Sequence, residues 1–489
     1  MLCILPPFEG WDEYQHVACL QHRLERGVHP TVGGTSVPAA LIQQLPGFPQ
    51  PRFALDQIQG SGARGYAEFW NPPEPPRGAC TVALYQAQQE PLYYRLAAPV
   101  FALAGGLADL RTSVFTLRAL NLLLLAAAVV LAGVPLLHTR TAATPPTLLA
   151  IATVPILLYS GLRVANDALA LAFSMAALFL LDRVTGARPR CAALAAGLAA
   201  GAAICTKTTA LPVVPAALTL TGLAYWRGAL SPRTATHVAG AFVLGCLVVA
   251  GPGLAANVRA FGALTPMQEG LDNARAGHGT GDLVRHALAL DWIEVLRRNW
   301  TRDPLWVGGW SYLRPPSWLR TAHEALLLLG LVAVLATGRR PPGSTAGLRA
   351  MATAGWATLA IGYVSLHSSL LHGDASLTPW YLAFAWPAVL TAVIQGFYSL
   401  PWRRVGPVLT AALITVFVAA ETHGVLHRMP RAYAGAELWN GAASRLASLR
   451  PPWLGTNTLL ITLALWLLLW GLTLRELWRY AEPARSRAS

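Results

Sequence analysis

The stretch CAALAAGLAAGAAICTKTTALPVVPAALTLTGLAYW, residues 191–226, lies between two arginines and contains one charged residue, Lys207. Its 36 residues are too many for one membrane-spanning helix, which needs about 20 apolar residues, and rather few for two. A polar break at Thr206–Thr209, followed by two prolines, divides the run. We therefore predict two short or tilted helices that meet in a turn around Lys207.

The whole chain has the composition of a multi-pass membrane protein. Of its 489 residues 54% are hydrophobic and 12% charged, and its mean hydropathy is +0.44. A soluble domain carries about 25% charged residues, so a water-soluble globule is excluded. Together with the two helices of 191–226, the remaining apolar runs predict an all-α polytopic protein of about eleven spans. These runs are 114–137, 147–162, 167–181, 238–258, 321–337, 351–367, 380–400, 407–422 and 457–474.

Arginine predicts the orientation of the chain. There are 37 lysine and arginine residues, of which Lys207 is the one lysine, and the formal net charge is +14. Positive residues in short loops stay on the cytoplasmic side, so the C-terminus is expected in the cytoplasm and residues 1–113 begin outside a plasma (inner) membrane. The lipid bilayer is thus an expected partner; nucleic acid is not, because the arginines are scattered between apolar runs. The segments expected in the cytoplasm hold 15 arginines and three acids: 138–146, 182–190, 227–237, 338–350, 401–406 and 475–489.

Two large extracytoplasmic segments follow from this topology. The first, 6–113, is too long for a simple connector; it contains Cys19 and Cys80, whose pairing the sequence leaves open. The second, 261–320, includes a stretch at 291–300 with the spacing of an amphipathic helix at the membrane interface. We divide the chain into a module of residues 1–260, this second segment, and the C-terminal spans of 321–489. Because Met1–Leu5 looks like the exit end of a first helix, we expect a longer reading frame upstream.

The first candidate site is PPFEGWDEYQH, residues 6–16, which places Asp12 and Glu13 directly outside the membrane and His16 four residues after Asp12. If a helix begins here, Asp12 and His16 share one face. A carboxylate near the interface can have a raised pKa and act as a base. The alternative is that both acids are favourable charges at the start of a helix.

Four basic or acidic residues near the same membrane surface are the other candidates. Arg118 is the one charge near the start of the 114–137 span, where it either snorkels to the headgroups or clamps a lipid phosphate. Arg163 and Asp167 belong to a tight hairpin between two spans, in which Asp167 also suits a helix start. Lys207 is an ionisable residue at membrane depth, which by default marks function. All four map to the outer leaflet with Asp12, as expected for a site that binds a phosphorylated lipid.

The ordered motifs PPFEGWDEYQH, QQEPLYYRLAAPVF, LRALNLLL, YSGLRVANDALAL and GAAICTKTTALPVVPA resemble the C-type (GT-C) membrane glycosyltransferases. The likeness is to protein mannosyltransferase-like members and to bacterial members that transfer arabinose or mannose. It covers about residues 1–260. The resemblance implies transfer of a sugar from a polyprenyl-phosphate donor to an acceptor (protein, lipid or cell-envelope glycan) on the extracytoplasmic face.

The resemblance also implies roles for individual residues. Asp12 would be the catalytic base with Glu13 beside it, and Asp167 the acid that opens the fourth helix. Arg118 and Lys207 would contact the lipid phosphate. Arg163 and His16 would also bind the substrate. We expect direct displacement with inversion at the anomeric carbon. Two departures weaken the match, because Gln89-Glu90-Pro91 replaces the usual His- or Lys-Pro-Pro, and Asn121 replaces a small residue.

Two other classes of function stay open. A transporter or lipid flippase would explain intramembrane charge, but it predicts ionisable groups in both leaflets. A non-catalytic paralogue of the glycosyltransferases would explain the departures. No cofactor is certain. A divalent metal also stays open, since His16, His372 and Asp374 lie on the expected outer side without a recognisable ligand spacing.

Overall fold

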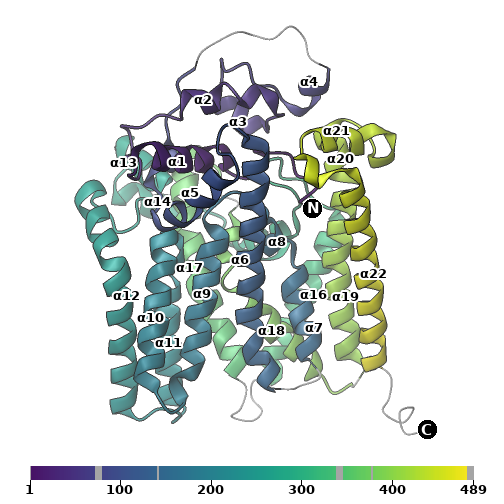
Figure 1. Cartoon of the computed structure of the whole chain (residues 1–489). Helices are drawn as coiled ribbons and strands as arrows, with labels where there is room; N and C mark the ends of the chain where they lie inside the picture. Colours follow the sequence, from purple (N-terminus) through teal and green to yellow (C-terminus); the bar gives the residue numbers. More distant parts are fainter. Residues whose placement is uncertain are drawn as a thin grey trace.

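The computed structural model describes residues 2–71, 80–139, 143–337, 345–375, 378–402 and 404–481, and these form helices joined by turns, with isolated bridges and no strand. The long helices form one bundle, and the short helices gather at one end of it, which we call the cap (Figure 1). The cap contains α1 (Glu13–Arg26), α2 (Ala39–Ile42), α3 (Arg52–Gln57), α4 (Tyr66–Trp70), α5 (Leu92–Leu103), α13 (Gln268–Arg275), α14 (Thr280–Ala289), α15 (Trp292–Arg297), α20 (Met429–Ala434) and α21 (Ala443–Ser448).

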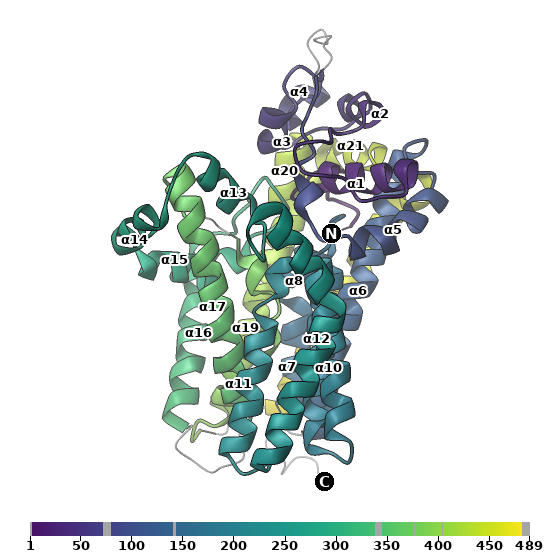
Figure 2. The same ribbon diagram turned by 90° about the vertical axis from the view of Figure 1, so that its left-hand side faces the viewer.

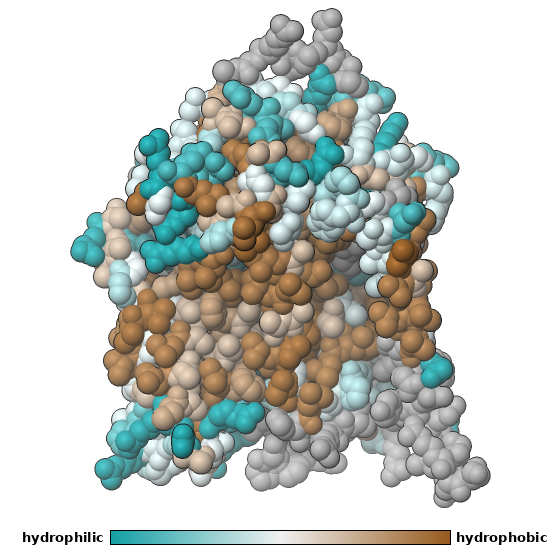
Figure 3. Space-filling view, viewed as in Figure 1, coloured by the Kyte–Doolittle hydropathy of each residue, from teal (hydrophilic) through white to brown (hydrophobic). Residues whose placement is uncertain are grey.

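The bundle contains the predicted apolar segments as helices. They are α6 (Leu110–Thr139), α7 (Thr144–Thr153), α8 (Pro155–Gly161), α9 (Asp167–Leu181), α10 (Pro189–Thr206), α11 (Val213–Trp226), α12 (Pro232–Phe261), α16 (Ser317–Thr337), α17 (Thr345–His372), α18 (Trp386–Tyr398), α19 (Val405–His423) and α22 (Thr456–Ala481). The surface shown in Figure 3 carries an apolar band over these helices, with polar residues on both sides of the band. The chain is therefore embedded in a membrane.

The expected count of about eleven spans is not confirmed. Among the described residues, seven helices are long and apolar enough to cross a membrane, or eight if the bent pair α7 and α8 is one span. One reason is visible at 380–400, where the helix α18 has only 13 residues. At 1.5 Å per residue it is about 20 Å long, shorter than the hydrocarbon core of about 30 Å.

The predicted span at 147–162 is broken in the middle. The helices α7 and α8 meet at an angle of 53°, and Val154 between them has an extended backbone (φ −65°, ψ 122°). The next residue, Pro155, explains the break, because a residue before proline is pushed out of the helical region. The bend brings the end of α8, and the hairpin after it, under the cap.

The turn predicted around Lys207 is present. It joins α10, which ends at Thr206, to α11, which begins at Val213. The helix α10 also packs closely on α12: a Cβ atom on Gly197 would lie 2.0 Å from the Phe242 carbonyl oxygen. Only glycine allows two helix backbones to approach so closely, and this contact fixes the middle of α10 against α12.

A buried carboxylate joins the parts of the cap. Glu9 accepts hydrogen bonds from the backbone N–H groups of Gly309 (3.1 Å) and Ser311 (2.8 Å) and from the hydroxyls of Tyr66 and Tyr433. Burial raises the pKa of Glu9, and the hydrogen bonds from Tyr66, Ser311 and Gly309 oppose that shift. The first segment is thus tied to residues more than 300 positions away.

The second segment contains more helix than the sequence predicts. The amphipathic helix expected at 291–300 is present as α15 and the turn of π-helix after it, Arg298–Arg302. Two further helices, α13 and α14, precede it, and α14 and α15 extend sideways beyond the bundle (Figure 2). The helix α13 lies nearer the centre, where it closes one side of the site described next.

Candidate functional site

A cavity of about 490 Å³ lies between the cap and the end of the bundle. Five of the seven predicted site residues line it: Asp12, His16, Arg163, Asp167 and Lys207. They come from α1, the α8–α9 hairpin and the α10–α11 turn. The opposite wall comes from the second segment and from the region before α18, and it includes Glu269, Trp310, Tyr312, His372, Trp380 and Tyr381.

Asp12 stands immediately before α1, so a helix does begin at this motif. Its backbone lies in the left-handed region (φ +55°), and its carboxylate accepts hydrogen bonds from the Tyr85 hydroxyl and from Nε2 of Gln86 (2.8 Å). Burial raises the pKa of Asp12 to about 6, against the lowering effects of Tyr85, Arg163 and Lys207. A carboxylate with this pKa is ionised at neutral pH and basic enough to accept a proton.

His16 lies one helical turn after Asp12 and also lines the cavity. Its Nδ1 is 2.7 Å from the Tyr94 hydroxyl, and burial, assisted by the positive charge of Lys207, lowers its pKa to about 3. His16 is therefore a neutral imidazole at physiological pH. It can donate or accept a hydrogen bond but adds no positive charge to the cavity.

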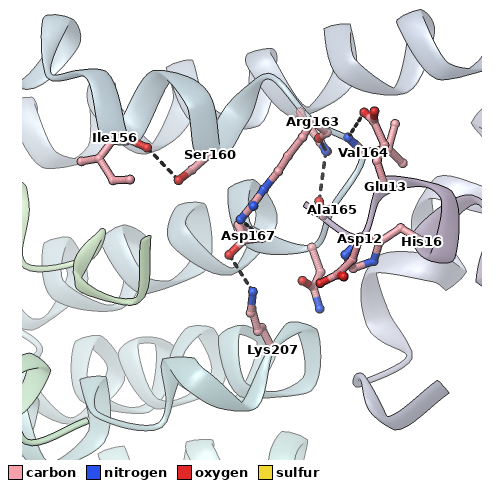
Figure 4. A network of polar contacts seen from close by, with 12 residues as sticks. Asp12, Glu13, His16, Ile156, Ser160, Arg163, Val164, Ala165, Asp167 and Lys207 are labelled. Atoms are coloured by element: carbon pink, nitrogen blue, oxygen red, sulfur yellow. Dashed lines mark hydrogen bonds and ion pairs between the residues drawn. The ribbon is translucent and has the colours of Figure 1, made fainter. Parts of the chain in front are cut away.

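A cluster of one acid and two bases faces Asp12. The carboxylate of Asp167 contacts Nη2 of Arg163 and Nζ of Lys207, each at 2.7 Å. Figure 4 shows these three side chains converging from the hairpin and the turn, with Asp12 and His16 beside them. Because two positive groups share one negative partner, this cluster has a net positive charge suited to an anionic ligand.

Arg163 is held in place from several sides. Its guanidinium carbon lies 4.0 Å from the ring centroid of Trp11 and 5.5 Å from that of Trp380. Its carbonyl oxygen accepts a hydrogen bond of 2.5 Å from Nδ2 of Asn121. A Cβ atom on Gly10 would lie 2.6 Å from the Cβ of Arg163, so a side chain there would displace it.

The structure does not bring Glu13 and Arg118 to the cavity. They form an ion pair of 2.6 Å with both side chains fully buried. The guanidinium of Arg118 also donates to the carbonyl oxygens of Leu5 and Pro6 (2.7 Å each), and Glu13 accepts from the backbone N–H of Phe8 (2.7 Å). Arg118 has no surface to offer a lipid phosphate, so its predicted role as a phosphate clamp is replaced by a structural one.

Several lining residues were missed by the sequence analysis. Tyr85 and Gln86 bind Asp12 across more than 70 residues of chain, and Trp380 precedes α18 far along the sequence. Glu269 on α13 faces the cavity, and burial raises its pKa. Among these residues, Trp11 could have been predicted from the sequence, because it is next to Asp12. The other positions depend on tertiary contacts.

The described residues contain no group of three His, Cys, Asp or Glu side chains that could bind a metal ion. Of the three metal candidates, His16 and His372 line the cavity and Asp374 does not. Cys19 and Cys80 are both free.

A second cavity of about 660 Å³ lies beside the first and shares Gln88 and Gln89 with it. Its walls come from α5, α12, residues 29–32 and 87–91, and Cys205, and 12 of the 19 lining residues are apolar. Seven lining residues are polar or charged. Among them are Arg95 and Glu90, and Glu90 accepts a hydrogen bond of 2.7 Å from Nδ2 of Asn257. A largely apolar cavity next to the Arg163–Asp167–Lys207 cluster suits a ligand with a hydrocarbon chain and an anionic head.

The fold and these cavities define an integral membrane protein with a charged site at one end of its helix bundle. Over residues 1–401 the chain matches the family of predicted membrane proteins DUF2142, and it belongs to this family. No glycosyltransferase family is among the matches. No curated protein and no solved structure matches the chain.

Proposed function

We propose that the protein is a membrane glycosyltransferase that moves a sugar from a polyprenyl-phosphate donor to an acceptor hydroxyl on the extracytoplasmic face. One observation carries the proposal: a carboxylate with a pKa of about 6, Asp12, shares a cavity with the net positive Arg163–Asp167–Lys207 cluster. A base and an anion-binding group in one cavity are what a transfer from a lipid phosphate requires.

The reaction is a direct displacement. The oxygen of the acceptor hydroxyl attacks the anomeric carbon, and its proton moves to the carboxylate of Asp12. The bond between the anomeric carbon and the phosphate oxygen breaks, and its electron pair stays on the phosphate. Arg163 and Lys207 stabilise that negative charge. Attack opposite the leaving group inverts the configuration at the anomeric carbon.

The neighbouring cavity supports a lipid-linked donor. A phosphate at the Arg163–Asp167–Lys207 cluster lies near Gln88 and Gln89, which the two cavities share. The hydrocarbon chain then occupies the second, mostly apolar cavity beside α12. Burial of each methylene group contributes about 0.8 kcal/mol, which favours a long prenyl chain over a soluble phosphosugar.

The test is transfer of label by the purified chain in vesicles. A polyprenyl-phosphate sugar with a labelled sugar is supplied with a membrane fraction as the source of acceptor. We expect label in the acceptor and release of unglycosylated polyprenyl phosphate, both dependent on the protein. Label that crosses the bilayer on an intact donor would instead establish a flippase and overturn the proposal.

A further inference from the structure

The first cavity has a side that the lipid donor does not use. It borders the second cavity through Gln88 and Gln89, and the prenyl chain of the donor lies beyond these residues in the proposed reaction. Its other side includes Phe53, on α3, and Tyr312. The helix α3 belongs to the part of the cap that points away from the long helices (Figure 1). A second substrate therefore approaches from the water side.

Two aromatic rings are exposed on that side. Phe53 is 53% exposed and Tyr312 is 36% exposed, and both line the cavity. Tyr312 has a left-handed backbone (φ +46°), which a bulky residue rarely adopts, and the loop that holds it is closed by a bridge between Val307 and Leu313. The face of an aromatic ring carries partial negative charge and attracts the C–H bonds of a sugar ring. The two rings thus offer packing surface to a ligand with an apolar face.

Glu269 on α13 contributes an available carboxylate to the same cavity. No other described residue donates a hydrogen bond to this carboxylate or forms an ion pair with it. Asp272, three residues later, is instead held by Nε2 of Gln268 and Nη1 of Arg275, each at 2.8 Å. Glu269 is partly exposed, and its oxygens are not among the buried polar atoms that lack a partner. A ligand in the cavity can therefore reach them.

The charge of Glu269 selects the kind of ligand. A carboxylate accepts hydrogen bonds from hydroxyl groups and repels a phosphate, so this wall suits the uncharged substrate, whereas Arg163 and Lys207 on the other wall suit the phosphate. In the proposed reaction Asp12 takes the proton of one hydroxyl, and Glu269 calls for a second hydroxyl on the same ligand. A sugar ring carries several hydroxyls, but a serine or threonine side chain and a diacylglycerol carry one each.

We propose that the acceptor is a carbohydrate bound between Glu269 and the exposed rings. One hydroxyl of its terminal sugar donates a hydrogen bond to Glu269, another loses its proton to Asp12, and the sugar ring packs against Tyr312. The inference rests on the proposed function, and it narrows the acceptor from protein, lipid or glycan to glycan.

The first test identifies the group that receives the sugar. The purified full chain in vesicles is given polyprenyl-phosphate sugar with a labelled sugar, together with a membrane fraction, and linkage analysis of the product identifies the residue that carries the label. We expect the label on a hydroxyl of another sugar. Label on a serine or threonine side chain, or on an acylglycerol, would overturn the inference and leave the proposed function intact. Absence of any protein-dependent transfer would instead refute the proposed function.

The second test compares Glu269→Gln with Asp374→Asn, which removes an exposed acid that does not line the cavity. Glu269→Gln keeps the shape of the side chain but replaces a charge-assisted hydrogen bond by a neutral one, which is roughly half as strong. We expect the amount of membrane fraction needed for half-maximal transfer to rise about tenfold, while binding of labelled polyprenyl phosphate stays unchanged. Asp374→Asn should change neither quantity. An unchanged requirement for acceptor in Glu269→Gln, or weaker binding of polyprenyl phosphate, would contradict the assignment of Glu269 to the acceptor.

Discussion

Asp12 and Glu13 are neighbours in the chain, but their carboxylates lie in two different environments. Glu13 forms a fully buried pair with Arg118, and backbone groups complete the hydrogen bonds of both. Asp12 faces a cavity with Arg163 and Lys207, where Nε of Arg163 has no acceptor among the described residues. In this membrane protein, the hydrogen-bond partners of a charged side chain, and not its position at the membrane surface, therefore decide whether it is structural or available to a ligand.

Loss of the Glu13–Arg118 ion pair should destabilise the fold strongly. Glu13→Gln leaves the charge of Arg118 buried without its partner, which costs about 3–5 kcal/mol of unfolding free energy. Chemical unfolding of the purified protein in detergent measures this loss. The control is Asp12→Asn, which removes a charge one residue away and should leave the unfolding midpoint near that of wild type. Equal destabilisation by both would contradict the division into two environments.

On the cavity side, the first prediction concerns Lys207. Lys207→Ala removes one of two positive charges but leaves Asp167 paired with Arg163, so the cluster becomes neutral and the fold is retained. We expect affinity for polyprenyl phosphate to fall about tenfold or more, as for loss of a charge-assisted hydrogen bond. Lys207→Arg keeps the charge and should recover part of the affinity. Unchanged binding by the alanine variant would remove Lys207 from the anion site.

The smallest effect is expected at the second cavity. Ala256 lines it, and the adjacent Ala255 on α12 does not. Ala256→Trp fills space assigned to the prenyl chain and should weaken binding of a long-chain donor about tenfold, the value of roughly two buried methylene groups. Ala255→Trp should have no effect, and a short-chain donor should bind both variants alike. A loss for both chain lengths would argue against a chain site here.

Much of the site follows from local sequence. The polar break and the prolines predict the turn at Lys207, the start of α1 places Asp12 and His16 on one side, and the short hairpin carries Arg163 and Asp167. Each of these depends on residues only a few positions apart, where helix geometry decides which side chains meet.

The rest depends on contacts between distant residues. Arg118 and Glu13 are separated by 105 positions, and no periodicity reveals that they pair. The wall that contains Glu269 and Trp380 comes from segments that approach α1 only in the folded chain. The span count differs for a more local reason, since apolar length alone does not show that α18 is short or that Val154 ends α7.

In the proposed reaction, Asp12 accepts the proton of the acceptor hydroxyl. The direct test is the rate of label transfer as a function of pH, measured with saturating donor for wild type and Asp12→Asn. Because Asp12 acts as a base only when ionised, and burial raises its pKa to about 6, the wild-type rate should rise with pH through about 6 and level off above it. Asp12→Asn should bind donor yet transfer at least about a hundredfold more slowly, without that rise. Transfer by Asp12→Asn at the wild-type rate, with the same pH dependence, would contradict the claim.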